Sequence, residues 1–271
     1  MTNRWKIIFD HEIQTFQICN TLPSLGDKTN QLQDITKKIE KHQSELPLLY
    51  RYSPANYWNI RSLEQQKLVL RPASEMNDIF EGDVVTSLHF ADMSEKIKGF
   101  QKGTYLKSLS DKELDLQMFA HYGDDFKGMC VEYDFTQCEE IQINKGQKKK
   151  SPIKDLFPVI YAEKQFESVE PESLENNRFF FLKKAKAWEY ESEWRFIRVV
   201  EDETKQKQEQ SVDVRGCIKT IYLGPRMEDV KKEHIKEIAK KINAQVKEVM
   251  LSDGKFALEA KGENDEHLNL R

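Results

Sequence analysis

The sequence lacks several features that would define its class directly. No apolar run approaches the roughly 20 residues that a membrane-spanning helix needs, and the N-terminus lacks the apolar core of a signal peptide. The cysteines are scattered without a C-x-x-C pair, so neither a metal site nor a disulfide scaffold is expected: Cys19, Cys130, Cys138 and Cys217. These absences favour a cytoplasmic protein that has no membrane partner.

Glycine-rich phosphate loops are also missing. The chain has no G-x-G-x-x-G and no G-x-x-x-x-G-K-S/T, which argues against kinases, NTPases and Rossmann enzymes. Nor does it have H-E-x-x-H or G-x-S-x-G. The formal net charge of -4 argues against wholesale, sequence-independent nucleic-acid binding, although it leaves room for a local basic groove.

The 271 residues fit one large domain, or one domain with an extension. We predict an N-terminal helical extension over residues 1–46, where Leu32, Ile35 and Ile39 step along one helix face. Residues 47–260 are predicted to form one domain, and 261–271 a polar tail. The mixed order of elements favours the α+β class. Strands are expected near 48–52, 67–70, 128–135, 194–200 and 218–223, and helices near 56–66, 90–120, 172–186 and 227–242.

The most informative segment is residues 186–196, where Glu189, Glu191 and Glu193 lie two positions apart before a strand-like run. Residues two apart in an extended chain share a face, so we expect Glu191 and Glu193 to point the same way, with Arg195 behind them. Like charges on one face repel each other. The spacing therefore indicates either carboxylate chemistry or a surface strand paired with lysines of its neighbour.

Several segments together resemble the bacterial domain-of-unknown-function family 2971. They are Leu49–Tyr52, the loop Pro72–Glu81, Met118–Tyr133 and Lys184–Arg195. In the loop, Met76 and Ile79 depart from the family pattern of Phe and Pro. The resemblance covers about residues 48–260, and it implies no function.

A second resemblance is to ADP-ribosyltransferases. Arg51, Ser74 and Glu191-Ser192-Glu193 occur in the order of their R-S-E pattern, but Pro72-Ala73-Ser74 offers only one hydroxyl. The resemblance implies a mixed, mostly antiparallel split sheet around a cleft, with NAD as the substrate. It also implies a macromolecular acceptor, with RNA or DNA as one candidate, and an antitoxin as a candidate protein partner. By analogy with that fold, the role would be that of a bacterial toxin or phage-defence effector.

This resemblance gives the residues specific roles. Glu193 would stabilise the oxocarbenium-like centre that forms when the nicotinamide–ribose bond breaks. Glu191 would accept a proton from the attacking nucleophile, and Arg51 would hold the diphosphate. The aromatic residues would form a wall for the nicotinamide ring. The predicted NAD-binding set is Arg51, Tyr52, Ser74, Asn77, Asp78, Phe80, His121, Tyr122, Trp188 and Arg195, with no metal.

Each of these assignments has a structural alternative. Arg51 can pair with Asp78 or Glu193 as a bridge within the fold. Asn77-Asp78 can form an Asx turn, and His121 can end a helix. Two other functions also remain open. One is a metal-dependent nuclease or phosphodiesterase that uses Asp78, His121, Glu191 and Glu193. The other is a non-catalytic binding module.

Overall fold

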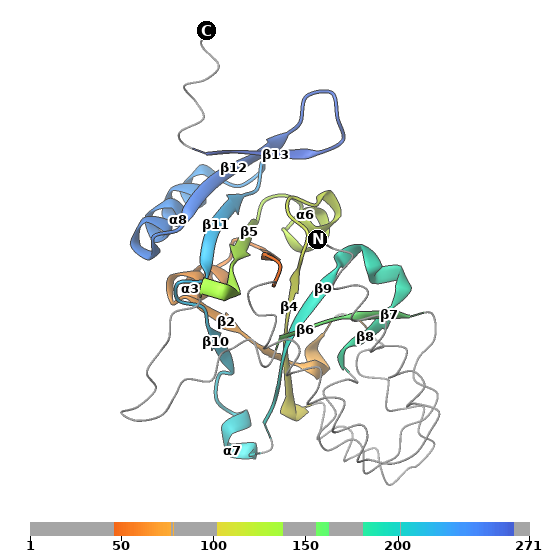
Figure 1. Ribbon diagram of the computed structural model, residues 1–271. Helices are drawn as coiled ribbons and strands as arrows, with labels where there is room; N and C mark the ends of the chain where they lie inside the picture. Colours follow the sequence, from red (N-terminus) through yellow and green to blue (C-terminus); the bar gives the residue numbers. More distant parts are fainter. Residues whose placement is uncertain are drawn as a thin grey trace.

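The computed structural model describes residues 46–76, 78, 102–137, 156–162, 181–200 and 202–262. Its largest sheet has nine strands (Figure 1). In spatial order they are β13 (Leu258–Gly262), β12 (Gln245–Leu251), β11 (Ile218–Leu223), β5 (Met129–Tyr133), β1 (Leu49–Ser53), β4 (Thr104–Ser110), β9 (Glu193–Val199) and β6 (Leu156–Pro158), with β3 (Arg71–Pro72) also paired to β4. Neighbours in this sheet run antiparallel, except β11 and β12, which are parallel.

Two small sheets and several helices surround the main sheet. The small sheets pair β2 (Lys67–Val69) with β10 (Ser211–Asp213), and β7 (Ile160–Ala162) with β8 (Lys183–Ala185). The described α-helices are α3 (Tyr57–Glu64), α6 (Leu116–Tyr122), α7 (Glu203–Gln206) and α8 (Asp229–Ile242). The described 3-10 helices are η2 (Ala73–Glu75), η4 (Phe135–Gln137) and η8 (Lys186–Glu191). None of the helices described here is long and apolar enough to cross a membrane.

The two faces of the main sheet pack against different helices. Successive residues of a strand point to opposite faces, and β5 shows the division. Val131 packs in a core with residues of α3 and α8, whereas Cys130 packs with Tyr52 and with Phe119 of α6. We call these the α8 face and the α6 face. The candidate site, described below, lies on the α6 face.

The α+β class and the mixed, mostly antiparallel sheet confirm the sequence predictions. Two segments were assigned wrongly. The first is residues 104–110, which were expected to be helical and form β4 instead. Thr104 and Tyr105 favour a strand, and β4 pairs along its whole length with β9. Tertiary pairing therefore overrides the weak helical pattern.

The end of the segment predicted to be helical over 172–186 is also a strand, β8. The predicted N-terminal helical extension falls outside the described residues except at Leu46, and the 47–260 domain boundary stays a prediction. Cys130 is a buried free thiol. Cys217 is disulfide-bonded, which the scattered spacing did not predict.

Candidate functional site

The two glutamates lie on either side of a sharp turn. Glu191 ends η8 and Glu193 begins β9, while Ser192 between them adopts a left-handed conformation with φ 45° and ψ 55°. A left-handed residue reverses the chain direction locally, so strand alternation does not extend through Ser192. Both side chains are nevertheless buried on the same side, with relative exposures of 3% for Glu191 and 4% for Glu193.

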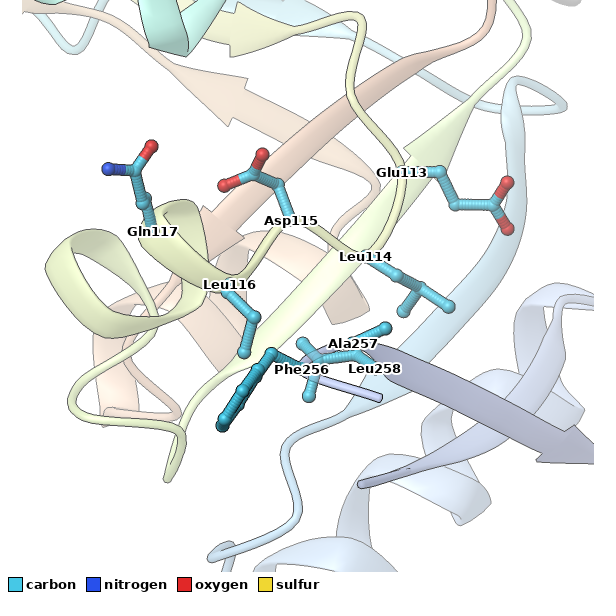
Figure 2. Close-up of a pocket in the computed structure, with 8 residues that line it drawn as sticks. All are labelled: Glu113, Leu114, Asp115, Leu116, Gln117, Phe256, Ala257 and Leu258. Carbon is cyan, nitrogen blue, oxygen red and sulfur yellow. The ribbon is translucent and has the colours of Figure 1, made fainter. Parts of the chain in front are cut away.

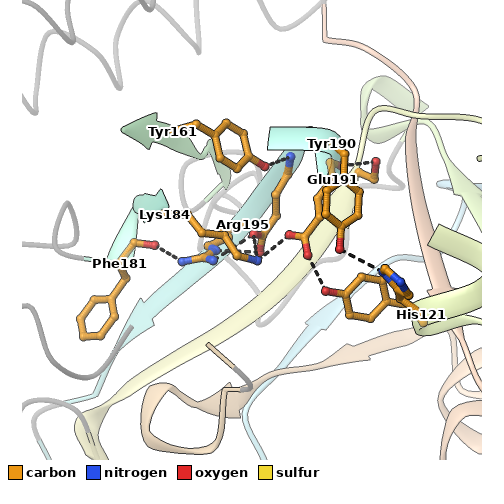
Figure 3. Close-up of polar contacts among 10 residues, drawn as sticks. His121, Tyr161, Phe181, Lys184, Tyr190, Glu191 and Arg195 are labelled. Carbon is orange, nitrogen blue, oxygen red and sulfur yellow. Dashed lines mark hydrogen bonds and ion pairs between the residues drawn. The ribbon is translucent and has the colours of Figure 1, made fainter. Parts of the chain in front are cut away.

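Two cations hold the glutamates together. Arg195 donates from Nε to Glu193 Oε1 over 2.7 Å and from its Nη2 to Oε2 over 2.9 Å. Lys184 Nζ bridges the pair, at 2.5 Å from Glu191 Oε2 and 3.1 Å from Glu193 Oε2. Arg195 is fully buried and also donates to the Phe181 carbonyl. We call Lys184, Glu191, Glu193 and Arg195 the charged cluster (Figure 3).

Charges within the cluster balance, since two carboxylates face two cations. Burial alone would raise the pKa of Glu193, but Arg195 and Lys184 outweigh it and lower that pKa to about 2. Burial and the nearby charge of Arg195 would lower the pKa of Lys184, but Glu193 and Glu191 outweigh them and raise that pKa above its usual value. Both net shifts favour the charged forms of Glu193 and Lys184, so the cluster is a closed set of ion pairs.

Backbone contacts fix the cluster in the sheet. The Ser110 hydroxyl donates to the Glu191 carbonyl over 2.6 Å, and the Glu193 N–H donates to the Tyr161 hydroxyl oxygen over 2.7 Å. Ser108 adds a side-chain hydrogen bond to the Glu193 carboxylate. These contacts come from β4 and β7, so the cluster also ties β9 to its neighbours.

An aromatic edge lies above the cluster, where η8 meets the end of α6. It consists of His121, Tyr122, Trp188 and Tyr190. Tyr122 and Tyr190 carry hydroxyls and are half-buried, as is Trp188, and His121 is exposed. The Tyr122 hydroxyl donates to Glu191 Oε1.

The rings of this edge also contact one another and the cluster. His121 Nδ1 lies 3.0 Å from the Tyr190 hydroxyl, and the Tyr190 hydroxyl is hydrogen-bonded to Tyr122. Lys184 Nζ lies 4.9 Å from the centre of the Trp188 ring. Figure 3 shows the contact of exposed His121 with Tyr190, and the contacts that run from Tyr122 through Glu191 towards buried Arg195.

The short helix α6 presents His121 and Tyr122 to this edge. Asp115 caps its first turn by accepting from the Met118 N–H over 3.0 Å. At the other end, a Cβ on Gly123 would lie 2.7 Å from the Phe119 carbonyl oxygen. The close approach there requires glycine, so the chain turns away immediately after Tyr122.

In the described part of the chain, Arg51 forms no ion pair or hydrogen bond with either glutamate, although the charge of Glu193 still raises its pKa. Tyr50 of β1 pairs with Ser110 of β4, which in turn pairs with Glu193 of β9, so these three share the α6 face. Arg51, one residue further along β1, points to the α8 face. An R-S-E arrangement with Arg51 beside Glu193 therefore does not form in this structure.

The other predicted residues are spread over the fold. Ser74 is exposed on η2, and Asp78 is buried with 5% exposure. Tyr52 lies beneath α6, where its hydroxyl donates to the Lys112 carbonyl and accepts from the Asp115 N–H. Asn77 and Phe80 lie outside the described residues. The structure thus brings together His121, Tyr122, Trp188, Glu191, Glu193 and Arg195 from the predicted set.

The cluster is poorly suited to a metal ion. Both oxygens of Glu193 accept hydrogen bonds from Arg195 and Lys184, so these cations occupy the positions that a metal would need. In the described ranges, no group of three or more His, Cys, Asp or Glu side chains is placed to hold a metal ion. The nuclease alternative therefore gains no geometric support.

A pocket of about 610 Å³ lies elsewhere, between the start of α6 and the loop joining β12 to β13 (Figure 2). Leu114, Leu116 and Leu258 give it an apolar wall, and Glu113 an acidic one. Phe256, at its rim, is fully exposed. None of the predicted site residues lines this pocket.

Sequence reasoning gave no role to Lys184, Tyr190, Ser108 or Ser110. Lys184 and Tyr190 lie in the segment that resembles family 2971, so that match could have drawn attention to them. The two serines are on β4, more than 80 residues before Glu191, and no local spacing connects them. Only the pairing of β4 with β9 reveals their contribution.

The fold and site define an α+β protein with a buried charged cluster beneath an aromatic edge. The profile of the family described as "Protein of unknown function (DUF2971)" matches residues 118–196, which supports the family resemblance. The matched range includes α6, β9 and the charged cluster. No curated protein and no solved structure matches the chain.

Proposed function

We propose that the aromatic edge binds a ligand with a planar ring, a nicotinamide or adenine nucleotide, and that the charged cluster is its rigid support. The observation that carries this proposal is the chain of contacts from His121 through Tyr190, Tyr122 and Glu191 to buried Lys184. Aromatic side chains provide large contact areas with little loss of conformational freedom. Buried ion pairs that hold these rings in place before the ligand arrives reduce the conformational entropy lost on binding.

Burial argues against Glu193 as a reacting group in this conformation. Its carboxylate is 4% exposed and both its oxygens are engaged by cations. A carboxylate that stabilises a reacting ribose must come within hydrogen-bonding distance of it. Glu193 would first have to leave Arg195 and Lys184, whereas the aromatic edge is accessible as it stands.

Calorimetric titration with NAD, nicotinamide mononucleotide and AMP tests this proposal. Trp188→Leu should weaken binding by at least about tenfold, which corresponds to about 1.4 kcal/mol. Trp58→Leu is the matched control, because Trp58 is 67% exposed and meets Tyr57 edge-on, away from the aromatic edge. Equal affinities for the wild type and Trp188→Leu, or no binding of any of the three ligands, would contradict the proposal.

ADP-ribosyl transfer from NAD to a macromolecule is a second candidate. It is favoured by the position of Glu191, which bonds to Tyr122 and so places a carboxylate one hydrogen bond below the edge. In this version Glu191, rather than Glu193, would approach the ribose and stabilise its positive charge. The acceptor, with nucleic acid as a candidate, and a toxin or defence role are further proposals without geometric support.

Incubation with labelled NAD and a cell lysate tests the second candidate. Transfer of label to protein or nucleic acid by the wild type, and its loss in Glu191→Gln with NAD binding retained, would establish the transferase. NAD binding without label transfer or nicotinamide release would leave the binding module as the function.

A further inference from the structure

Two partly buried cations share the α8 face of the main sheet, away from the charged cluster. Arg51 lies in the middle of β1 and Lys107 in β4. Because Tyr50 pairs with Ser110 in antiparallel register, Arg51 and Lys107 project from the same face. Arg71 of β3 pairs with Leu106, the residue before Lys107 in β4, so the backbone of Arg71 lies next to that of Lys107.

Neither cation is held in an ion pair among the described residues, although the charge of Glu193 acts on Arg51 from a greater distance. Arg51 Nε is buried without a hydrogen-bond acceptor, and no carboxylate in the described part of the chain forms an ion pair with Arg51 or Lys107. This contrasts with the α6 face, where Lys184 and Arg195 are each paired with a carboxylate.

Burial and mutual repulsion both act against the charges of these cations. Burial lowers the pKa of Lys107 well below its usual value, and nearby Arg51 and Arg71 lower it further. Burial and nearby Arg71 also lower the pKa of Arg51, and together they outweigh the opposing effects of Tyr133, Glu193 and Tyr122. Positive charge that is withdrawn from water without a partner is unfavourable. A bound anion would remove this cost.

We propose that Arg51 and Lys107, with exposed Arg71 at their side, bind a phosphate group of a small phosphorylated molecule. Arginine offers a planar fork of donors to phosphate oxygens and lysine a compact positive charge, a pairing that suits a doubly charged group. The site lies on the opposite face from the aromatic edge and requires no ring. It is therefore independent of the proposed function.

Thermal unfolding and calorimetry with inorganic phosphate, pyrophosphate and ADP test this site. Pyrophosphate should stabilise the wild type in a saturable manner, with one site per chain. Lys107→Met should weaken its binding by at least about tenfold, and Arg71→Gln, a change at an exposed position, by roughly threefold. Lys205→Met is the control, because the Lys205 side chain is 68% exposed in a surface ion pair.

The outcomes separate the sources of the phosphate. Tighter binding of ADP than of pyrophosphate would identify a nucleotide, whereas equal binding would identify the phosphate group alone. Trp188→Leu should leave pyrophosphate binding unchanged, so failure of the aromatic-edge proposal would not affect this result. Equal loss in Lys107→Met and Lys205→Met, or no saturable binding of any of the three probes, would overturn the site.

Discussion

Glu193→Gln should destabilise the protein strongly, because it removes one charge from a balanced buried set. In the wild type Glu191 and Glu193 offset Lys184 and Arg195. In the variant Glu191 remains as the one carboxylate of the cluster, and one positive charge is left uncompensated. Glutamine preserves the shape of the side chain, so the change is mainly electrostatic.

The size of the effect follows from the burial of the partners. Removing one member of a buried ion pair typically costs about 3–5 kcal/mol, since the remaining charge stays desolvated. For a chain of this size each kcal/mol lowers the melting temperature by roughly 2–4 °C. The melting temperature of Glu193→Gln should therefore fall by about 6–20 °C.

Urea unfolding of a matched set of variants measures this effect. Glu189→Gln is the control, because Glu189 is exposed in the same 3-10 helix, and it should change stability by no more than about 0.5 kcal/mol. Adding Lys184→Gln to Glu193→Gln restores the charge balance, so the double variant should be less destabilised than the sum of the single changes. Strict additivity, or a Glu193→Gln variant as stable as the control, would refute the reasoning.

Three other predictions concern the same fold. The pKa of Glu193 is lowered from 4.5 to about 2, so its ionised carboxylate contributes on the order of 3 kcal/mol to the free energy of unfolding above pH 4.5. This contribution is lost as the pH falls towards 2. The stability of Glu193→Gln, measured by acid titration, should not show this loss. Lys107→Met should raise stability in phosphate-free buffer, because it removes a partly buried charge without a counter-ion, and a lower urea midpoint than that of the wild type would contradict this. Asp115→Ala should cost about 1 kcal/mol by removing the cap of α6, and an unchanged urea midpoint would show that the cap contributes nothing.

Much of the fold could be predicted from local patterns. The strand at 49–53 and the helix at 57–64 lie close to their predicted limits, because Pro54 ends the strand and Asn56 caps the helix. The strand at 104–110 could not be predicted in this way. It depends on pairing with β9, some 90 residues later, and no local pattern reveals a partner at that separation.

The candidate site was predictable in its residue types but not in its arrangement. Spacing alone indicated that Glu191 and Glu193 act together, and both do bind Lys184. The spacing did not reveal that Arg51 lies on the opposite face of the sheet from Glu193, because the register between β1 and β4 decides which residues share a face. Nor did it reveal that both Lys184 and Arg195 form ion pairs with the two glutamates, since Lys184 belongs to a separate strand.

A crystal structure of the protein soaked with NAD would test most directly whether the charged cluster supports the aromatic edge. We predict that the nicotinamide or adenine ring packs against Trp188 and Tyr190 while Glu193 stays bonded to Arg195 and Lys184. A ribose hydrogen-bonded to a Glu193 released from Arg195, or NAD bound away from this edge, would contradict that assignment.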